Sequence, residues 1–142
     1  MGVSATVHAM ASGTMPDGEI IESVDLGKCW HAIHFLLSGT AVAGEGAAQL
    51  LLSGVPLADI SDAEVLQNSA DKVQQFAAFL EGTPNSALFG RCDARRAGEL
   101  DVYNFDFLEA DAHDHIAQYL DKLREFTSRH ARSGHDLLVV IA

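Results

Sequence analysis

Apolar side chains recur between residues 25 and 39 at the spacing of an α-helix, and this stretch holds the only tryptophan of the chain. At about 100° per residue, one stripe of such a helix collects Leu26, Trp30, Ile33 and Leu37. Phe35 would lie on the opposite side, so the helix is apolar nearly all round, which is typical of a helix buried in the middle of its domain. Ser23 or Asp25 can cap its start, and Gly39 can close its end in a left-handed conformation. The pattern therefore predicts a core helix.

The two ends of the chain have the patterns of strands. Residues 3–10 alternate small or apolar side chains with polar ones, which predicts a half-buried first strand. Residues 136–142 form a continuous apolar run, which predicts a strand buried on both faces in the middle of a small sheet. A polar loop around Pro16 follows the first strand, and we expect the next apolar pair, Ile20 and Ile21, to anchor the entry to the core helix.

Further segments have helical spacing. A short apolar helix is expected at residues 47–52. Ser69 can cap a helix that ends at Gly82 and whose apolar positions are Val73, Phe76, Ala77 and Leu80. Residues 86–96 predict a shorter helix that turns three arginines outward, namely Arg91, Arg95 and Arg96. Residues 109–133 predict the longest helix, with acids at its start, bases at its end and a buried stripe of Ile116, Leu120, Leu123 and Thr127.

The remaining segments have weaker patterns. Residues 55–57 and 65–66 fit short extended pieces, although residues 62–67 could equally form a helical turn. Residues 100–107 alternate imperfectly around aromatic side chains, which favours an extended segment. At 142 residues the chain suits one domain, residues 1–142. We therefore predict an α+β fold in which a small sheet contains the N- and C-terminal strands and is covered by about four to five helices.

Charge narrows the classes of partner. The formal net charge is -11, and residues 1–71 contain nine acidic residues but only one basic residue, Lys28. Such a balance argues against nucleic acid as a partner and favours solubility or a basic partner. No apolar run reaches the ~18 residues that a membrane span needs, and the N-terminus lacks the positive region of a signal peptide. We expect a cytoplasmic protein without a membrane partner.

Motifs for covalent chemistry are missing from the sequence. There is no G-x-S-x-G elbow, and Cys29 and Cys92 are isolated cysteines without CxxC spacing, as expected for two free thiols in a reducing compartment. No carboxylate is set apart by its local sequence as a general acid. The sequence therefore predicts a protein that is not an enzyme.

The seven histidines are the natural place to look for a metal site. His31 and His34 share the i, i+3 spacing of the core helix, but we expect His34 in the core and His31 at the surface. His113 and His115 would point some 200° apart on a helix. We therefore predict no metal and no cofactor. The open alternative is a small-molecule or metal site beside the tryptophan, formed by Lys28, Trp30, His31, His34 and Tyr103.

Four pieces of the sequence occur in an order and spacing found together in a known family. They are Lys28-x-Trp30-x-x-Ile33-His34-Phe35-x-Leu37-Ser38-Gly39, the 69–80 helix, Val102-Tyr103 and Gly134-x-x-Leu137-Leu138-Val139-Val140-Ile141. In these pieces the chain resembles the bacterial YfbM-like family, a domain of unknown function. The resemblance implies an α+β fold whose terminal strands share a small sheet, and it carries over no catalytic residue.

Acidity and the lack of catalytic motifs favour a binding protein. We expect a non-enzymatic immunity protein that neutralises a bacterial toxin by covering a basic surface, because toxins that act on nucleic acids or nucleotides have positive active sites. The predicted binding residues are the acids of the segment before the core helix, Asp17, Glu19, Glu22 and Asp25.

Overall fold

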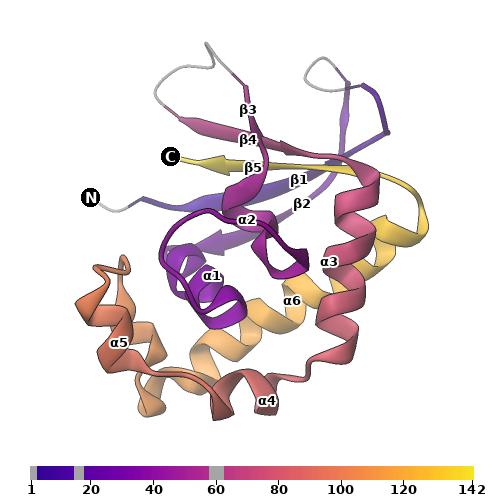
Figure 1. Cartoon of the computed structure of the whole chain (residues 1–142). Helices are drawn as coiled ribbons and strands as arrows, with labels where there is room; N and C mark the ends of the chain where they lie inside the picture. The colour runs from indigo at the N-terminus through magenta and orange to yellow at the C-terminus, as the bar shows by residue number, and fades with distance from the viewer. Residues whose placement is uncertain (1–2, 15–17, 58–62) are drawn as a thin grey trace.

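A five-stranded antiparallel sheet forms one side of the molecule (Figure 1). The computed structural model describes residues 3–14, 18–57 and 63–142. The strands are β1 (Ala5–Met10), β2 (Ile20–Gly27), β3 (Val55–Pro56), β4 (Glu64–Asn68) and β5 (Asp136–Ile141). Their order is β2-β1-β5-β4-β3, so the C-terminal strand is central and pairs with the N-terminal one. The prediction that the two terminal strands share a sheet is confirmed.

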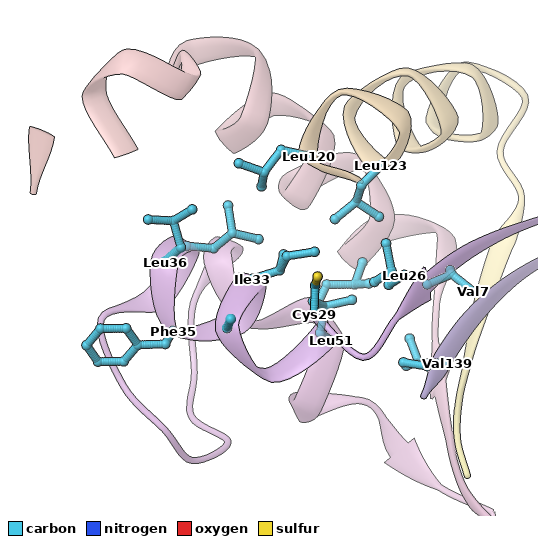
Figure 2. Packing of buried hydrophobic residues seen from close by; sticks show 14 of the residues in the cluster. Val7, Leu26, Cys29, Ile33, Phe35, Leu36, Leu51, Leu120, Leu123 and Val139 are labelled. Carbon is cyan, nitrogen blue, oxygen red and sulfur yellow. The ribbon is translucent and has the colours of Figure 1, made fainter. Parts of the chain in front are cut away.

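Alternation along the strands separates the two faces of the sheet. In β1 and β5, Val7 pairs with Val139, and their side chains belong to the main core between the sheet and the helices (Figure 2). On the opposite face Met10, Val65 and Leu138 form a smaller apolar cluster. β5 is apolar at nearly every position because it contributes to both clusters.

Helices cover the first of these faces (Figure 1). In the described ranges six are α-helical, somewhat more than the four to five expected: α1 (Trp30–Ser38), α2 (Leu50–Ser53), α3 (Ala70–Gly82), α4 (Asn85–Gly90), α5 (Ala94–Glu99) and α6 (His113–Arg132). Three 3-10 turns accompany them, at Ala47–Gln49, Phe105–Leu108 and Ala110–Ala112. The α+β class is confirmed.

The core helix is α1, and its residues 32–37 are all buried. Ile33 points toward the α6 residues Leu120 and Leu123 (Figure 2), and none of the three is more than 1% exposed. Gly39 ends the helix with φ 77°, and its N–H donates to the Phe35 carbonyl over 2.7 Å. The predicted burial and the predicted end of this helix are both confirmed.

The predicted start of the core helix was wrong. Residues 20–27 form the strand β2. Leu26 is therefore a buried residue of a strand, and Ile20 and Ile21 belong to the same strand rather than to a segment that leads into the helix. The Asp25 carboxylate accepts from the Gly27 N–H over 2.7 Å, and Gly27 has φ 55°, a conformation that glycine adopts at little cost. This turn ends the strand, and pairing with β1 prevails over the helical spacing of the apolar residues.

Two other segments differ from their predictions. The helix expected at 86–96 is two helices, because Asp93 leaves the helical conformation and its carboxylate caps α5 by accepting from the Arg96 N–H over 3.0 Å. Residues 100–107 are not extended, since the chain passes through left-handed conformations at Asp101 and Asn104 into a 3-10 turn. The segment at 64–68 is a strand, which decides between the two alternatives left open there.

Candidate functional site

The structure gathers much of the site predicted around the tryptophan. The Trp30 ring stacks on the His31 ring with 5.0 Å between centroids, and the Tyr103 ring lies 6.1 Å from Trp30. The Trp30 Nε1–H donates to the Val3 carbonyl over 2.9 Å, while the Val3 N–H donates to the Tyr103 hydroxyl over 3.0 Å. We call Trp30, His31 and Tyr103 the tryptophan clasp, because they hold the N-terminal segment against α1.

Both ring nitrogens of His31 are used within the clasp. The Tyr103 N–H donates to Nδ1 over 2.8 Å, so that nitrogen is unprotonated and the proton of the neutral ring is on Nε2. Nε2–H in turn donates to the Ala41 carbonyl over 2.7 Å. A metal ion would have to displace one of these backbone partners, so the contacts of His31 are those of a structural residue.

His34 and Lys28 do not join His31 in a binding arrangement. His34 is fully buried, its Nε2–H donates to the Val42 carbonyl over 2.9 Å, and burial lowers the pKa of its imidazole. The Lys28 side chain is exposed, and its carbonyl accepts a 3.4 Å bond from Asn104. The structure therefore places His34 in the core, Lys28 at the surface and the clasp between them.

The paired histidines of α6 serve packing. His113 stacks on Phe89 with 4.3 Å between ring centroids, and His115 stacks on Phe107 at 5.3 Å. Within the ranges that the structure describes, no three His, Cys, Asp or Glu side chains come together in a group that could hold a metal ion. His113 and His115 stack on two separate aromatic rings, so their imidazoles do not form one site.

The acids predicted to bind a partner have different environments. Asp17 lies outside the described residues, and Glu19 and Asp25 are exposed. Glu22 is occupied: both its oxygens accept from Arg129, over 2.7 and 2.9 Å, and one also accepts from His130 over 2.5 Å. Hydrogen bonding to Arg129, and then to His130, lowers the pKa of the Glu22 carboxyl. Glu22 is therefore committed to α6.

Sequence reasoning missed a second acidic surface. Residues 97–121 contain seven Asp or Glu and no Lys or Arg. Five of these acids are exposed and form no ion pair within the described residues; we call them the acidic run, Asp101, Asp106, Glu109, Asp111 and Asp114. Phe105 lies among them with 36% of its surface exposed. This local run of acidic residues is visible in the sequence, but it was missed because the charges were summed over each half of the chain.

The three arginines predicted to face outward are exposed and have acidic or backbone partners. Arg95 and Arg96 both approach Glu99 at 3.4 Å. Arg91 donates to the Leu37 carbonyl over 2.7 Å, at the end of α1. These groups are satisfied by the chain itself.

Neither thiol is activated for nucleophilic chemistry. Cys29 is buried, which raises its pKa to about 11, and burial also raises the pKa of Cys92. A reactive cysteine requires a lowered pKa, because the thiolate is the nucleophile.

Over the part of the chain that is described, no helix is both long enough and apolar enough to span a bilayer.

Comparison with known proteins agrees with this fold. A crystal structure of YfbM from Escherichia coli, a protein of unknown function, superposes with a TM-score of 0.72 at 18% identity, over 98% of this chain and 99% of that one. No curated protein matches the chain. The family model "Domain of unknown function (DUF1877)" matches residues 10–140. The chain therefore belongs to the DUF1877 family and has the fold of YfbM, as its resemblance to the YfbM-like family implied.

Proposed function

We propose that this protein is a non-enzymatic, cytosolic binding protein that covers a basic surface of a protein partner, and specifically an immunity protein that neutralises a bacterial toxin. The observation that carries the proposal is the acidic run, five exposed carboxylates within fourteen residues that form no ion pair with any described residue, on a chain whose net charge is -11. Toxins that act on nucleic acids or nucleotides need positive active sites, so a carboxylate-rich cover is complementary to them.

The environment of the acidic run supports a role in recognition. Its carboxylates follow one another from the end of α5 to the first turn of α6. Asp106 and Asp111 lie in the 3-10 helices Phe105–Leu108 and Ala110–Ala112, and Asp114 lies in the first turn of α6. The half-exposed Phe105 supplies an aromatic group, the kind of side chain that is enriched at the centres of interfaces. Charges around such an anchor accelerate association and exclude partners of like charge.

The test uses the proteins encoded beside this chain in its genome. Each neighbouring product is co-expressed with the chain, and co-purification and growth are measured. We expect one neighbour to be toxic alone, to be neutralised by the chain and to bind it. Reversal of three acids of the run, in the variant Asp106→Lys, Glu109→Lys and Asp111→Lys, is expected to weaken that binding by roughly 10-fold or more at low salt.

A matched variant controls for net charge. Glu45→Lys, Glu64→Lys and Glu81→Lys change the net charge by the same amount at exposed positions outside the acidic run. We expect this control to bind the partner nearly as well as the unmodified chain. Equal weakening by the two triple variants, or no weakening by either, would show that the acidic run is not the binding surface. If no neighbouring product binds, the immunity role is wrong.

A further inference from the structure

A surface hollow of about 550 Å³ lies between the edge strand β2 and the C-terminal end of α6. Ile21 and Glu22 line it from β2, and Arg132, Ser133 and His135 line it from the end of α6 and the turn into β5. Glu22 is the only acidic residue of the lining and is paired with Arg129, so the hollow is rich in basic and hydroxyl groups on a chain that is strongly acidic.

Three side chains beside the hollow form a hydrogen-bonded chain, which we call the histidine relay: Glu22, His130 and His135. An ionised carboxylate only accepts hydrogen bonds, so the 2.5 Å contact with Glu22 places the His130 proton on Nε2. When both rings are neutral, His130 Nδ1 is an acceptor, and the His135 Nδ1 at 2.9 Å is its donor. A neutral His135 therefore carries an unprotonated Nε2.

The geometry identifies this contact as a hydrogen bond rather than as a pair of metal ligands. The ring centroids lie 5.2 Å apart, which is the Nδ1–Nδ1 distance plus the radii of the two rings. Each nitrogen therefore points at the other, whereas two ligands of one ion would converge on a third point. His130 is only 5% exposed and packs on Phe126 with 4.5 Å between ring centroids, so the contact is fixed in place.

The relay can hold one further proton without moving a heavy atom. A proton added at His135 Nε2 leaves its Nδ1–H donating to His130, which still donates to Glu22. The proton between the two Nδ1 atoms can also lie on His130, which then pairs directly with the Glu22 carboxylate. In both arrangements that carboxylate stabilises the positive charge, and His135 Nε2 carries an N–H.

The charged groups nearby differ in whether they are paired. Arg129 forms an ion pair with Glu22, and the Asp136 carboxylate accepts from the Gly13 N–H over 3.1 Å. Arg132 is exposed and forms no ion pair among the described residues, so its guanidinium can bind an anion. An anion between Arg132 and His135 would bind to both.

The end of α6 does not oppose such an anion strongly. Its last carbonyls already accept hydrogen bonds from the backbone N–H groups of Ser133, Gly134 and His135, over 3.2, 3.2 and 3.0 Å. These bonds satisfy the negative end of the helix, and the Ser133 hydroxyl adds a donor to the wall of the hollow.

We propose that this hollow binds a small oxyanion, a phosphate, sulfate or carboxylate group, between Arg132 and His135, and that binding is coupled to protonation of His135. The proposal does not depend on the protein partner proposed above. Coupling to one proton makes binding tighter as the pH falls through the range in which histidine titrates.

Calorimetry with sulfate is the principal test, because sulfate keeps its charge across pH 5.5–7.5 and any change in affinity then reports on the protein. Affinity is expected to increase about 10-fold from pH 7.5 to 5.5, because binding takes up a histidine proton. Inorganic phosphate and acetate, measured at one pH, show which oxyanion the hollow prefers.

The variants separate the two side chains. His135→Gln is expected to weaken binding and to abolish its pH dependence, whereas Arg132→Gln weakens binding and leaves the pH dependence in place. The exposed residues His115 and Arg95 supply matched controls, His115→Gln and Arg95→Gln, which should bind like the unmodified chain. Binding that is independent of pH, or that is equal in all variants, would overturn the proposal.

Nuclear magnetic resonance of the imidazole nitrogens tests the relay without any substitution. The neutral protein should show His130 protonated at Nε2 and His135 protonated at Nδ1, and added sulfate should shift the His135 signals toward the charged form at pH 6.5. The opposite tautomers, or His135 signals that do not respond to sulfate, would contradict the proposed site.

Discussion

The tryptophan clasp and the histidine relay both join a strand or terminal segment to a helix through imidazole rings packed on aromatic side chains, yet they use the ring nitrogens differently. In the clasp, both nitrogens of His31 bond to backbone groups, of Ala41 and Tyr103. In the relay, His130 bonds to two titratable side chains, and the chain ends at the half-buried His135. Backbone partners hold His31 in one arrangement, whereas the side-chain partners of His130 can themselves gain or lose a proton.

The comparison between the clasp and the relay is tested most directly by removing one ring from each, Trp30 from the clasp and His135 from the relay. Trp30→Ala should lower the free energy of unfolding by about 3 kcal/mol, since it deletes the stacked ring and the bond to Val3. His135→Gln should cost less than about 1 kcal/mol, because the side chain is half-buried and an amide can donate to His130. Urea unfolding of both variants checks the pair; costs of similar size would show that the relay is as structural as the clasp.

The pH dependence of stability distinguishes a buried histidine from the relay. Burial holds the pKa of His34 below its ordinary value of 6.5, so the unfolded chain binds the proton first as the pH falls. Its contribution to stability is present above pH 6.5 and is lost as the pH falls through that value, with a slope of at most about 1.4 kcal/mol per pH unit.

The expected measurement is the free energy of unfolding between pH 7.5 and 5.5, where the carboxyl of Glu22 stays ionised and does not contribute. His34→Gln should flatten that slope, and His115→Gln, at an exposed position, should leave it unchanged. A slope that is the same in His34→Gln and in the unmodified chain would assign the effect to other groups, such as His8, whose pKa is also lowered by burial.

The smallest expected effect concerns the turn that positions His135. Gly134 has φ 70°, and nothing lies within 4 Å of the place where a Cβ would be, so Gly134→Ala suffers only the backbone strain of a left-handed residue. We expect a loss of about 1 kcal/mol in the free energy of unfolding and a shift of the His135 imidazole signals. A stable variant with unshifted signals would show that the relay does not depend on the conformation of this turn.

The periodicity of apolar residues correctly predicted the helices and strands whose buried faces are marked by their own apolar residues. β5 is apolar on both faces, and α3 and α6 carry one apolar stripe each, so any neighbour that covers them satisfies the pattern. β2 was missed because its exposed positions include Ile20 and Ile21, 53% and 51% exposed, which blur the alternation of an edge strand. Pairing with β1 is a long-range contact that no local window contains.

The sequence by itself determined the α+β class, the central C-terminal strand, the core helix and the excess of negative charge. It also grouped Trp30, His31 and Tyr103, with Lys28 and His34, in one possible pocket, because polar and titratable groups lie beside the tryptophan. Only the tertiary structure decided what their atoms do, because the partner of each ring nitrogen comes from a distant segment: Tyr103 lies 72 residues from His31, and Glu22 lies 108 residues from His130. A hydrogen bond requires two atoms about 3 Å apart, and the positions of two residues in the sequence do not show whether their atoms come that close.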